Sequence, residues 1–299
     1  MGDVEEGLGI RLANLWNRRK ATMTPAVAAA RGRVDHLAPA VVVTGGSRGI
    51  GSAMAQRFAT AGYRVAIVSR TAGALEAAAQ AMSQPAGTRV ISIACDVTQQ
   101  DAFDIIERRL TDEGLYLDVL VNNAAIGLSG PFALHDDEQL GDLIALNVTA
   151  LTRLSRKALP EMLQRRRGGI LNLASLGGYA PGPHQAAYYA SKAYVISLTE
   201  ALAAEASGFG VRISVVAPGP VDTNFHAAMS ADNALYRSLL PSLSPERVAA
   251  SAYRGFIFGQ RVIVPHLFNR AMQIALKILP HPLTVPLVAW LLKNRQSRA

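Results

Sequence analysis

The chain has 299 residues, of which 50% are hydrophobic and 17% are charged. A chain of this length and composition can bury one large core and is not intrinsically disordered. Its single cysteine, Cys95, excludes an internal disulfide and a cysteine-based zinc site.

The formal net charge of +8 is carried mainly by the two ends of the chain. Residues 40–245 contain 16 Lys or Arg and 17 Asp or Glu, whereas residues 246–299 contain 8 Lys or Arg and 1 acid. No nucleic-acid recognition motif accompanies this basic excess, so we expect no nucleic-acid partner.

Residues 1–38 are predicted to be an N-terminal extension. They mix apolar residues such as Leu15 and Trp16 with Arg and Lys, which is compatible with a weakly amphipathic targeting or surface helix. Asp3 and Glu5 argue against an organelle presequence, and no secretory hydrophobic region is present. We expect a poorly ordered extension on a cytoplasmic protein.

The first predicted strand, residues 40–44, is short, apolar and rich in β-branched residues. Gly45, Gly49 and Gly51 follow it, and a helical pattern comes next. Strand, glycine turn and helix form the first unit of a dinucleotide-binding fold. Glycines let the backbone approach a pyrophosphate closely, and the helix N-terminus offers N–H groups to the phosphates. The alternative is that these glycines form a tight loop between strand and helix that binds no ligand.

Apolar, strand-like runs recur along the chain with helical patterns between them. The runs are 40–44, 64–69, 89–95, 117–122, 169–174, 211–217 and 261–264. Such alternation predicts an α/β fold, a Rossmann-like doubly wound parallel sheet of about seven strands with helices on both faces. We assign residues 39–265 to this dinucleotide-binding and catalytic domain.

Ligands of such sheets bind beyond the carboxyl ends of the strands. The second strand ends in Ser69 and Arg70, and no acid follows before Glu76. An enzyme that prefers NAD usually places an acid there to bind the ribose 2′-hydroxyl. Arg48 lies in the glycine turn, and two guanidinium groups would suit a 2′-phosphate. We therefore predict NADP(H) as the cofactor.

Ser175 lies thirteen residues before Tyr188, and Lys192 lies four residues after it. A lysine one helical turn away faces the same side as the tyrosine and favours the phenolate by its charge. This brings the phenol, whose ordinary pKa is about 10, closer to the pH at which it exchanges protons with an alcohol or ketone oxygen. The spacing alone is weak evidence for a catalytic pair, because a tyrosine and a lysine four residues apart on a helix are common by chance.

Six motifs occur in one order along the chain. They are Thr44-Gly45-Gly46-Ser47-Arg48-Gly49-Ile50-Gly51, Asn122-Asn123-Ala124-Ala125, Asn147, Ser175, Tyr188-x-x-x-Lys192 and Pro218-Gly219-Pro220-Val221-Asp222-Thr223. Together they resemble the short-chain dehydrogenase/reductase family over about residues 38–265. Ala125 departs from the glycine that is usual in the family, but it is still a small residue.

The resemblance implies roles for these positions. Tyr188 would exchange a proton with the substrate oxygen, and Ser175 would hold that oxygen. Lys192 would also bind the nicotinamide ribose, and Asn147 would hold a water that links the lysine to solvent. The implied cofactor contacts are Gly45, Ser47, Arg48, Gly49, Ile50, Gly51, Ser69, Arg70, Asp96, Val97, Asn123, Tyr188, Lys192, Val221 and Thr223.

We therefore predict an NADPH-dependent oxidoreductase that interconverts a carbonyl and a secondary alcohol by hydride transfer, without a metal. Apolar side chains in residues 222–245, such as Phe225, Met229 and Tyr236, favour an apolar substrate. The family implies a homodimer or homotetramer. The alternative is a catalytically silent NADP-binding protein, or a membrane-surface protein, with the same fold.

Residues 266–299 are predicted to be a basic and apolar helical extension. An apolar helical face runs from Leu267 to Leu279, and prolines interrupt the pattern after it. Residues 283–292 are apolar again but too few to span a bilayer. Three interpretations compete: the extension packs on a neighbouring subunit, caps an apolar substrate cleft, or rests on an anionic membrane surface.

Overall fold

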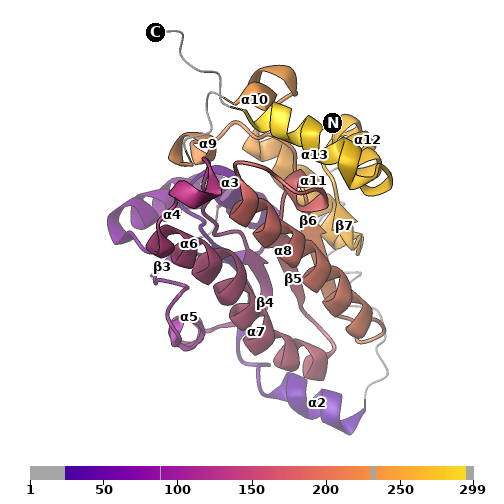
Figure 1. The fold of residues 1–299 in the computed structure, drawn as a ribbon. Helices are drawn as coiled ribbons and strands as arrows, with labels where there is room; N and C mark the ends of the chain where they lie inside the picture. Colours follow the sequence, from indigo (N-terminus) through magenta and orange to yellow (C-terminus); the bar gives the residue numbers. More distant parts are fainter. Residues whose placement is uncertain (1–23, 88, 230–233, 294–299) are drawn as a thin grey trace.

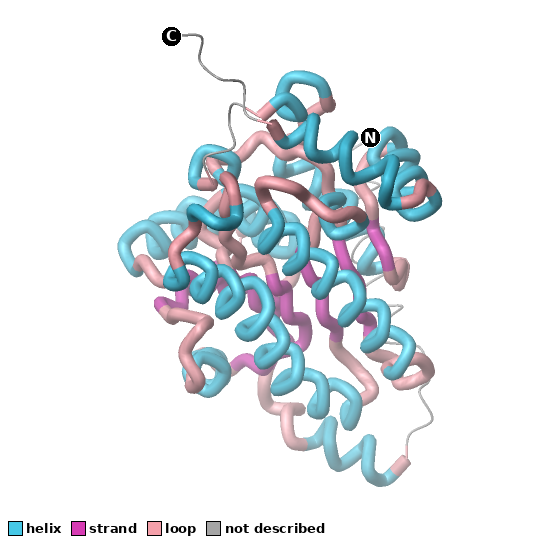
Figure 2. Tube along the Cα trace, in the orientation of Figure 1, coloured by secondary structure: helices cyan, strands magenta, loops and turns pink. Residues whose placement is uncertain are grey.

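A computed structural model of the protein describes residues 24–87, 89–229 and 234–293. Seven parallel strands form one sheet in the order β3-β2-β1-β4-β5-β6-β7, with helices packed around it (Figures 1 and 2). The strands are β1 (Ala38–Thr44), β2 (Arg64–Ser69), β3 (Val90–Ala94), β4 (Leu115–Asn122), β5 (Gly169–Leu173), β6 (Arg212–Val216) and β7 (Val262–Ile263). The predicted Rossmann-like doubly wound sheet is confirmed, and each strand ends within two residues of its predicted bounds.

Helices cover both faces of the sheet. The first face packs against α3 (Gly49–Thr60), α4 (Ala72–Ala86) and α11 (Pro245–Ile257). The second packs against α5 (Ala102–Asp112), α7 (Leu151–Arg165) and α8 (Ala186–Glu205), of which α7 and α8 lie in front of the sheet in Figure 1. Because both faces are covered, the strands are largely apolar without regular polar alternation, and Asp118, Asn172 and Ser214 are buried polar exceptions.

The order of the strands reverses at β1. From β1 the chain builds outward through β2 and β3, then returns to place β4 on the other side of β1. In folds of this kind the loops on the two sides of the reversal diverge, and ligands bind in the crevice between them, beyond the carboxyl ends of the strands.

Shorter elements connect or extend this framework. They are α2 (Pro25–Gly32), η1 (Phe132–Leu134), α6 (Asp137–Ile144), η2 (Ala145–Ala150), η3 (Leu176–Tyr179), α9 (Phe225–Ala228), α10 (Leu235–Leu239), α12 (Leu267–Ile278) and α13 (His281–Leu292). The prediction that the C-terminal extension is helical is confirmed over α12 and α13. Both helices lie at the end of the molecule that also holds α9 and α10 (Figure 1).

The expectation of a poorly ordered extension fails for residues 24–38. Thr24 caps the start of α2 through its side-chain oxygen. Pro25 occupies the first turn, where a backbone N–H would have no partner within the helix, so the missing N–H of proline costs no hydrogen bond. Val27 and Ala30 are buried, and α2 packs against α7. A turn over residues 33–37 then leads into β1 at Ala38. Residues 1–23 lie outside the described part of the chain.

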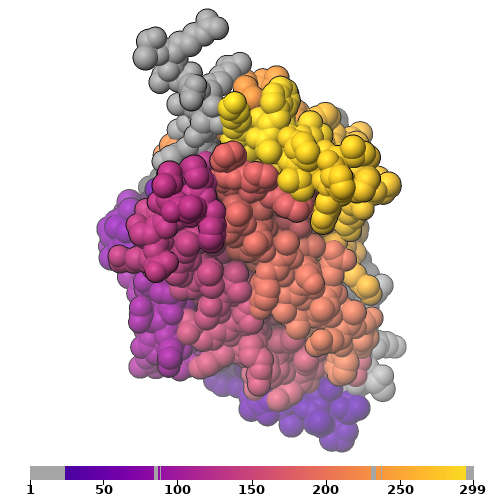
Figure 3. All heavy atoms as spheres, in the orientation of Figure 1, coloured from indigo at the N-terminus to yellow at the C-terminus, as the bar shows by residue number. Residues whose placement is uncertain are grey.

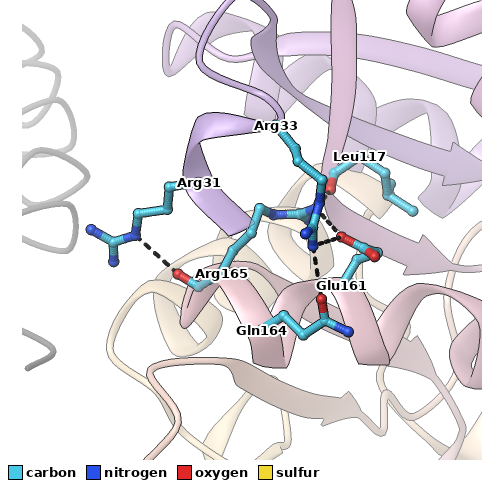
Figure 4. Close-up of polar contacts among 6 residues, drawn as sticks. All are labelled: Arg31, Arg33, Leu117, Glu161, Gln164 and Arg165. Carbon is cyan, nitrogen blue, oxygen red and sulfur yellow. Dashed lines mark hydrogen bonds and ion pairs between the residues drawn. The ribbon is translucent and has the colours of Figure 1, made fainter. Parts of the chain in front are cut away.

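Polar contacts complete the attachment of α2 (Figure 4). The Arg31 side chain donates a hydrogen bond to the carbonyl oxygen of Arg165 at 3.0 Å, and Arg33 donates one to Gln164 Oε1 at 2.8 Å. Arg165, which is buried, in turn donates to the Leu117 carbonyl in β4. The helix is therefore fastened to the end of α7 and, through Arg165, to the sheet.

Candidate active site

The glycine turn between β1 and α3 lies at the reversal of the strand order. Gly45 and Gly49 have φ angles of 64° and 58°, in the left-handed region that favours glycine. A Cβ atom at Gly51 would lie 2.3 Å from the Gly45 carbonyl oxygen, so the helix starts directly against the turn. Ser47, Arg48 and Ile50 complete this backbone cradle, whose helix N-terminus can accept a phosphate group.

Asn123 braces the glycine turn. Its side-chain amide donates hydrogen bonds to the carbonyl oxygens of Thr44 at 2.9 Å and Gly45 at 3.2 Å. The Thr44 hydroxyl accepts hydrogen bonds from the backbone N–H groups of Asn123 and Ala124. The hydroxyl of Thr44 thus joins β1 to β4. The sequence contained Thr44 within the motif, but only the structure assigns it this bracing contact.

Val221 and Thr223 face the glycine turn from the other side. A Cβ atom at Gly49 would lie 3.3 Å from Thr223 Cγ2, which places that side chain across the turn. Val221 is buried and pairs with Leu243 in an isolated bridge. The segment after β6 therefore lies beside the turn after β1.

Residues at the far side of the crevice follow β2 and β3. Arg70 is exposed directly after Ser69, and Arg48 is exposed at the start of α3. Burial raises the pKa of Asp96, but two hydrogen bonds from Thr98 and the charge of Arg70 outweigh it, so the pKa lies below its ordinary value. Asp96 is therefore ionised and close enough to Arg70 for their charges to interact.

Val97 differs from its neighbour Asp96 in being buried. It lies in the core cluster on the second face of the sheet, and its carbonyl oxygen accepts a hydrogen bond from Arg153 of α7.

Helix α8 and the end of β5 bring together the three residues singled out by spacing. The Ser175 hydroxyl, which also accepts a hydrogen bond from the Gly177 N–H at 3.1 Å, is hydrogen-bonded to Tyr188. The Lys192 ammonium lies 5.6 Å from the centre of the Tyr188 ring. Tyr188 and Lys192 thus lie on one face of α8, as their spacing predicts, and that face points to the end of β5.

Lys192 is buried, and its ammonium group donates a hydrogen bond of 3.0 Å to the Leu173 carbonyl. Burial lowers the pKa of this ammonium group to about 8. The group therefore remains mostly protonated at neutral pH and provides a positive charge beside the phenol.

Burial raises the pKa of Tyr188 above its ordinary value, the hydrogen bond with Ser175 lowers it in part, and Tyr236 adds a smaller upward contribution. In the cofactor-free protein the phenol is therefore neutral and carries the proton that a carbonyl reduction requires. Lys192 is not a cause of this shift, so the lowering of the phenol pKa that its spacing predicts does not occur in this state.

Asn147 lies in η2, a π-helical turn between α6 and α7 rather than in a continuous α-helix. Its side-chain oxygen accepts a hydrogen bond from Ile126 N–H, and its amide donates to the Ile126 carbonyl and to the Ser191 hydroxyl. Ser191 donates to the Tyr188 carbonyl. Asn147 thus connects the loop after β4, which contains Ile126, to the turn of α8 that carries Tyr188 and Lys192.

An aromatic wall continues outward from Tyr188. The Phe225 ring lies 5.6 Å from the Tyr188 ring, and Met229 is buried beside Gly127. The Tyr236 hydroxyl and His226 Nδ1 are 2.7 Å apart, which joins α9 to α10. Nothing in the sequence spacing of His226 indicates this partner.

The C-terminal extension packs against the same aromatic residues through α13. Val288 and Leu292 of α13 pack with Tyr236, and Tyr189 lies against the same cluster. Leu235 N–H donates a hydrogen bond to the Lys293 carbonyl. These contacts attach the extension to α10 and α8 of its own chain.

Comparison with known proteins agrees with this geometry. Residues 39–234 match the family model described as short chain dehydrogenase. A 3-oxoacyl-[acyl-carrier-protein] reductase, MabA, from Mycobacterium avium is 33% identical over 225 residues, which cover 75% of this chain and 83% of the relative. The chain belongs to the short-chain dehydrogenase family, and it is an oxidoreductase of that family.

Solved structures show the same fold. A short-chain dehydrogenase from Sphingobium yanoikuyae in complex with NADPH is 30% identical, with a TM-score of 0.70 over 81% of this chain and 96% of that chain. A short-chain dehydrogenase/reductase from Burkholderia phymatum in complex with NAD is 24% identical, with a TM-score of 0.73 over 80% of this chain and 92% of that chain. The fold therefore accommodates both nicotinamide cofactors.

Proposed function

We propose that the protein is an NADPH-dependent reductase that converts a carbonyl to a secondary alcohol and catalyses the reverse oxidation. The observation that carries the proposal is the hydrogen-bonded pair of Tyr188 and Ser175 above the buried Lys192. This group lies at the carboxyl end of β5, where Lys192 donates to the Leu173 carbonyl.

The residues of the crevice fit a dinucleotide. The glycine turn leaves no room for side chains at Gly45 and Gly51, and its helix N-terminus faces the crevice. A reduced nicotinamide held there would supply the hydride for reduction of a carbonyl carbon. Within this proposal Val221 offers backbone groups to the carboxamide and Thr223 a hydroxyl, while Asn123 holds the turn and Lys192 also binds the ribose.

In the proposed reaction Tyr188 gives its proton to the carbonyl oxygen as the bond order of the carbonyl falls. Ser175 donates a hydrogen bond to that oxygen and fixes its position. The charge of Lys192 stabilises the phenolate that Tyr188 becomes. Asn147 holds the Ile126 loop and α8 in register and positions a water through which the proton is replaced.

Two arginines support NADPH over NADH. Arg48 and Arg70 are both exposed at the side of the crevice beyond β1 and β2, and no acid occupies the end of β2. A guanidinium group binds a phosphate through forked hydrogen bonds, so the pair suits a ribose 2′-phosphate. Asp96 and Val97 lie beyond them and would border the adenine. The complex of the Sphingobium yanoikuyae relative with NADPH is consistent with this choice.

The substrate that we propose is a fairly apolar ketone. Phe225 and Met229 provide apolar surface next to Tyr188, and the Tyr236–His226 pair adds polar groups at its edge. The relative from Mycobacterium avium is a 3-oxoacyl reductase, so 3-oxoacyl thioesters are the first compounds to test. We further propose a cytoplasmic homodimer or homotetramer.

A panel of ketones and 3-oxoacyl thioesters tests the proposal, with NADPH oxidation followed at each substrate concentration. We expect turnover of at least one apolar substrate. The control is a titration of nicotinamide fluorescence, which measures binding without turnover. Tight NADPH binding together with no turnover across the panel would instead support the alternative, a catalytically silent NADP-binding protein.

A further inference from the structure

The C-terminal helices expose a continuous set of large apolar side chains, which we call the tail face. On α12 they are spaced by seven and four residues, and on α13 by four and three, so each helix presents one stripe. The tail face consists of Leu267, Ile274, Ile278, Leu283, Leu287 and Trp290. Leu267 is 79% exposed, Ile278 74% and Trp290 53%. The two helices form a yellow ridge at one end of the molecule (Figure 3).

The opposite sides of these helices are already in use. Val288 and Leu292 of α13 and Leu276 of α12 join one cluster with Tyr189 and Tyr236. Because the inner sides of both helices meet this cluster, the tail face points away from the domain. The exposed stripes are therefore not needed to hold the helices in place.

Basic side chains border the tail face. Arg270 and Lys277 are seven residues apart on α12 and hence lie along one edge of its apolar stripe. Residues 266–299 contain five Lys or Arg and no Asp or Glu. An apolar stripe beside cations, together with an exposed Trp, is the composition of helices that lie in the interface of an anionic bilayer.

Neither helix can cross a bilayer. Each has 12 residues, which corresponds to about 18 Å of helix, against roughly 30 Å of hydrocarbon. Among the described residues, no helix is both long and apolar enough for a membrane span. The tail face is therefore suited to lie on a membrane and not to pass through it.

We infer that the tail face docks on the surface of an anionic lipid bilayer. A second copy of the chain is the competing partner. A symmetric dimer through this face would bring the same patch of each copy together, and the cations at its edge would meet cations with no acid of residues 266–299 between them. The charge pattern thus favours lipid. The inference concerns binding alone and holds whether or not the proposed reaction takes place.

Trp290 is a built-in reporter for this contact. The chain has two tryptophans, so in a Trp16→Phe variant all tryptophan emission comes from the tail face. We expect phosphatidylcholine vesicles containing phosphatidylserine to shift this emission to shorter wavelength and to make it quenchable by brominated lipid. Unchanged emission would overturn the inference, even if residues 1–23 carried the protein to the vesicles.

Co-sedimentation with the same vesicles tests the surface itself. Ile274→Ser with Ile278→Ser should abolish binding, whereas Phe209→Ser, a change of an exposed apolar residue at the other end of the sheet, should leave it unchanged. Arg270→Gln with Lys277→Gln should weaken binding roughly 10- to 30-fold at low salt. Circular dichroism and NADPH binding identify variants that have unfolded.

The oligomeric state separates the two partners. If the Ile274→Ser, Ile278→Ser variant binds vesicles like the unchanged protein, or if it loses a dimer that the unchanged protein forms and neither protein binds vesicles, the inference is wrong. Binding that is equally strong to vesicles of phosphatidylcholine alone would contradict the role of the basic edge.

Discussion

Lys192 holds a charge in a buried position, and this has a measurable consequence. Its pKa is lowered from 10.5 in water to about 8 in the folded protein, so between these values the unfolded chain binds more protons than the folded protein. The free energy of unfolding therefore rises with pH across this window. The stability gained from deprotonation of Lys192 is complete above pH 10.5 and is lost as the pH falls through about 8. In full, the shift corresponds to a few kcal/mol, on the order of 1.4 kcal/mol per pKa unit.

A Lys192→Met variant tests this at the residue scale. Without the titrating group, the variant should gain Tm relative to the unchanged protein at about pH 7 and lose that relative gain toward pH 10. Thermal unfolding of both cofactor-free proteins across this pH range measures the effect. A Tm difference that does not change with pH would show that Lys192 is not buried as a charge.

The two arginines of the crevice give a second prediction at this scale. Arg48→Ala and Arg70→Ala should each raise the KM for NADPH roughly 10- to 100-fold, because each removes hydrogen bonds to a doubly charged phosphate. NADH lacks that phosphate, so its KM serves as the internal control and should change little. Equal effects on both cofactors would place the arginines elsewhere than at the 2′-phosphate.

Contacts between residues were predictable only where they followed a periodic rule. Tyr188 and Lys192 share a helical face, and that follows from their spacing of four. The Tyr236–His226 pair spans two short helices and a segment that joins them, so no period of the sequence indicates it. The buried state of Lys192 likewise depends on Leu173, nineteen residues away.

At the scale of elements, α2 is held by its buried side. Ala30→Asp would place an unpaired carboxylate against α7 and should lower the Tm by several degrees, at a cost of about 1–3 kcal/mol. Ala29→Asp is the matched control, because Ala29 lies on the exposed side of the same helix. Equal Tm values for the two variants would mean that α2 adds no stability.

Helix α13 allows a similar comparison in an activity assay. Val288→Ala would loosen the cluster that holds Tyr236, at a cost on the order of 1–2 kcal/mol, and should raise the substrate KM several-fold without changing NADPH affinity. Leu287→Ala, on the exposed side of α13, should leave both values unchanged in the absence of lipid. A Val288→Ala variant with normal KM would separate the extension from substrate binding.

The elements differ in how far the sequence predicts them. All seven strands are apolar runs with turn residues at their ends, so their positions follow from pattern alone. Helix α2 carries no comparable pattern, since its small residues bury little surface each and its stability comes from α7. The π-helical turn η2 has the residue types of an ordinary helix, and the side-chain contacts of Asn147 to Ile126 and Ser191 become visible only in three dimensions.

The whole molecule assembles its site from segments far apart in the chain. The turn after β1, the end of β5, the first turns of α8 and the segment after β6 meet at one edge of the sheet because the strands are parallel and ordered around β1. The parallel sheet, and with it this edge, was predictable from the alternation of elements. The packing of α12 and α13 around Tyr236 of α10 was not, since the pattern of the extension left three interpretations open.

The proposed proton transfer by Tyr188 is tested most directly by the kcat of a Tyr188→Phe variant, with Tyr189→Phe as the matched control on the next position of the same helix. We predict that kcat falls by roughly two to four orders of magnitude for Tyr188→Phe while NADPH binding is retained, and that Tyr189→Phe keeps most of the activity. A Tyr188→Phe variant that turns over like the unchanged protein would contradict the account.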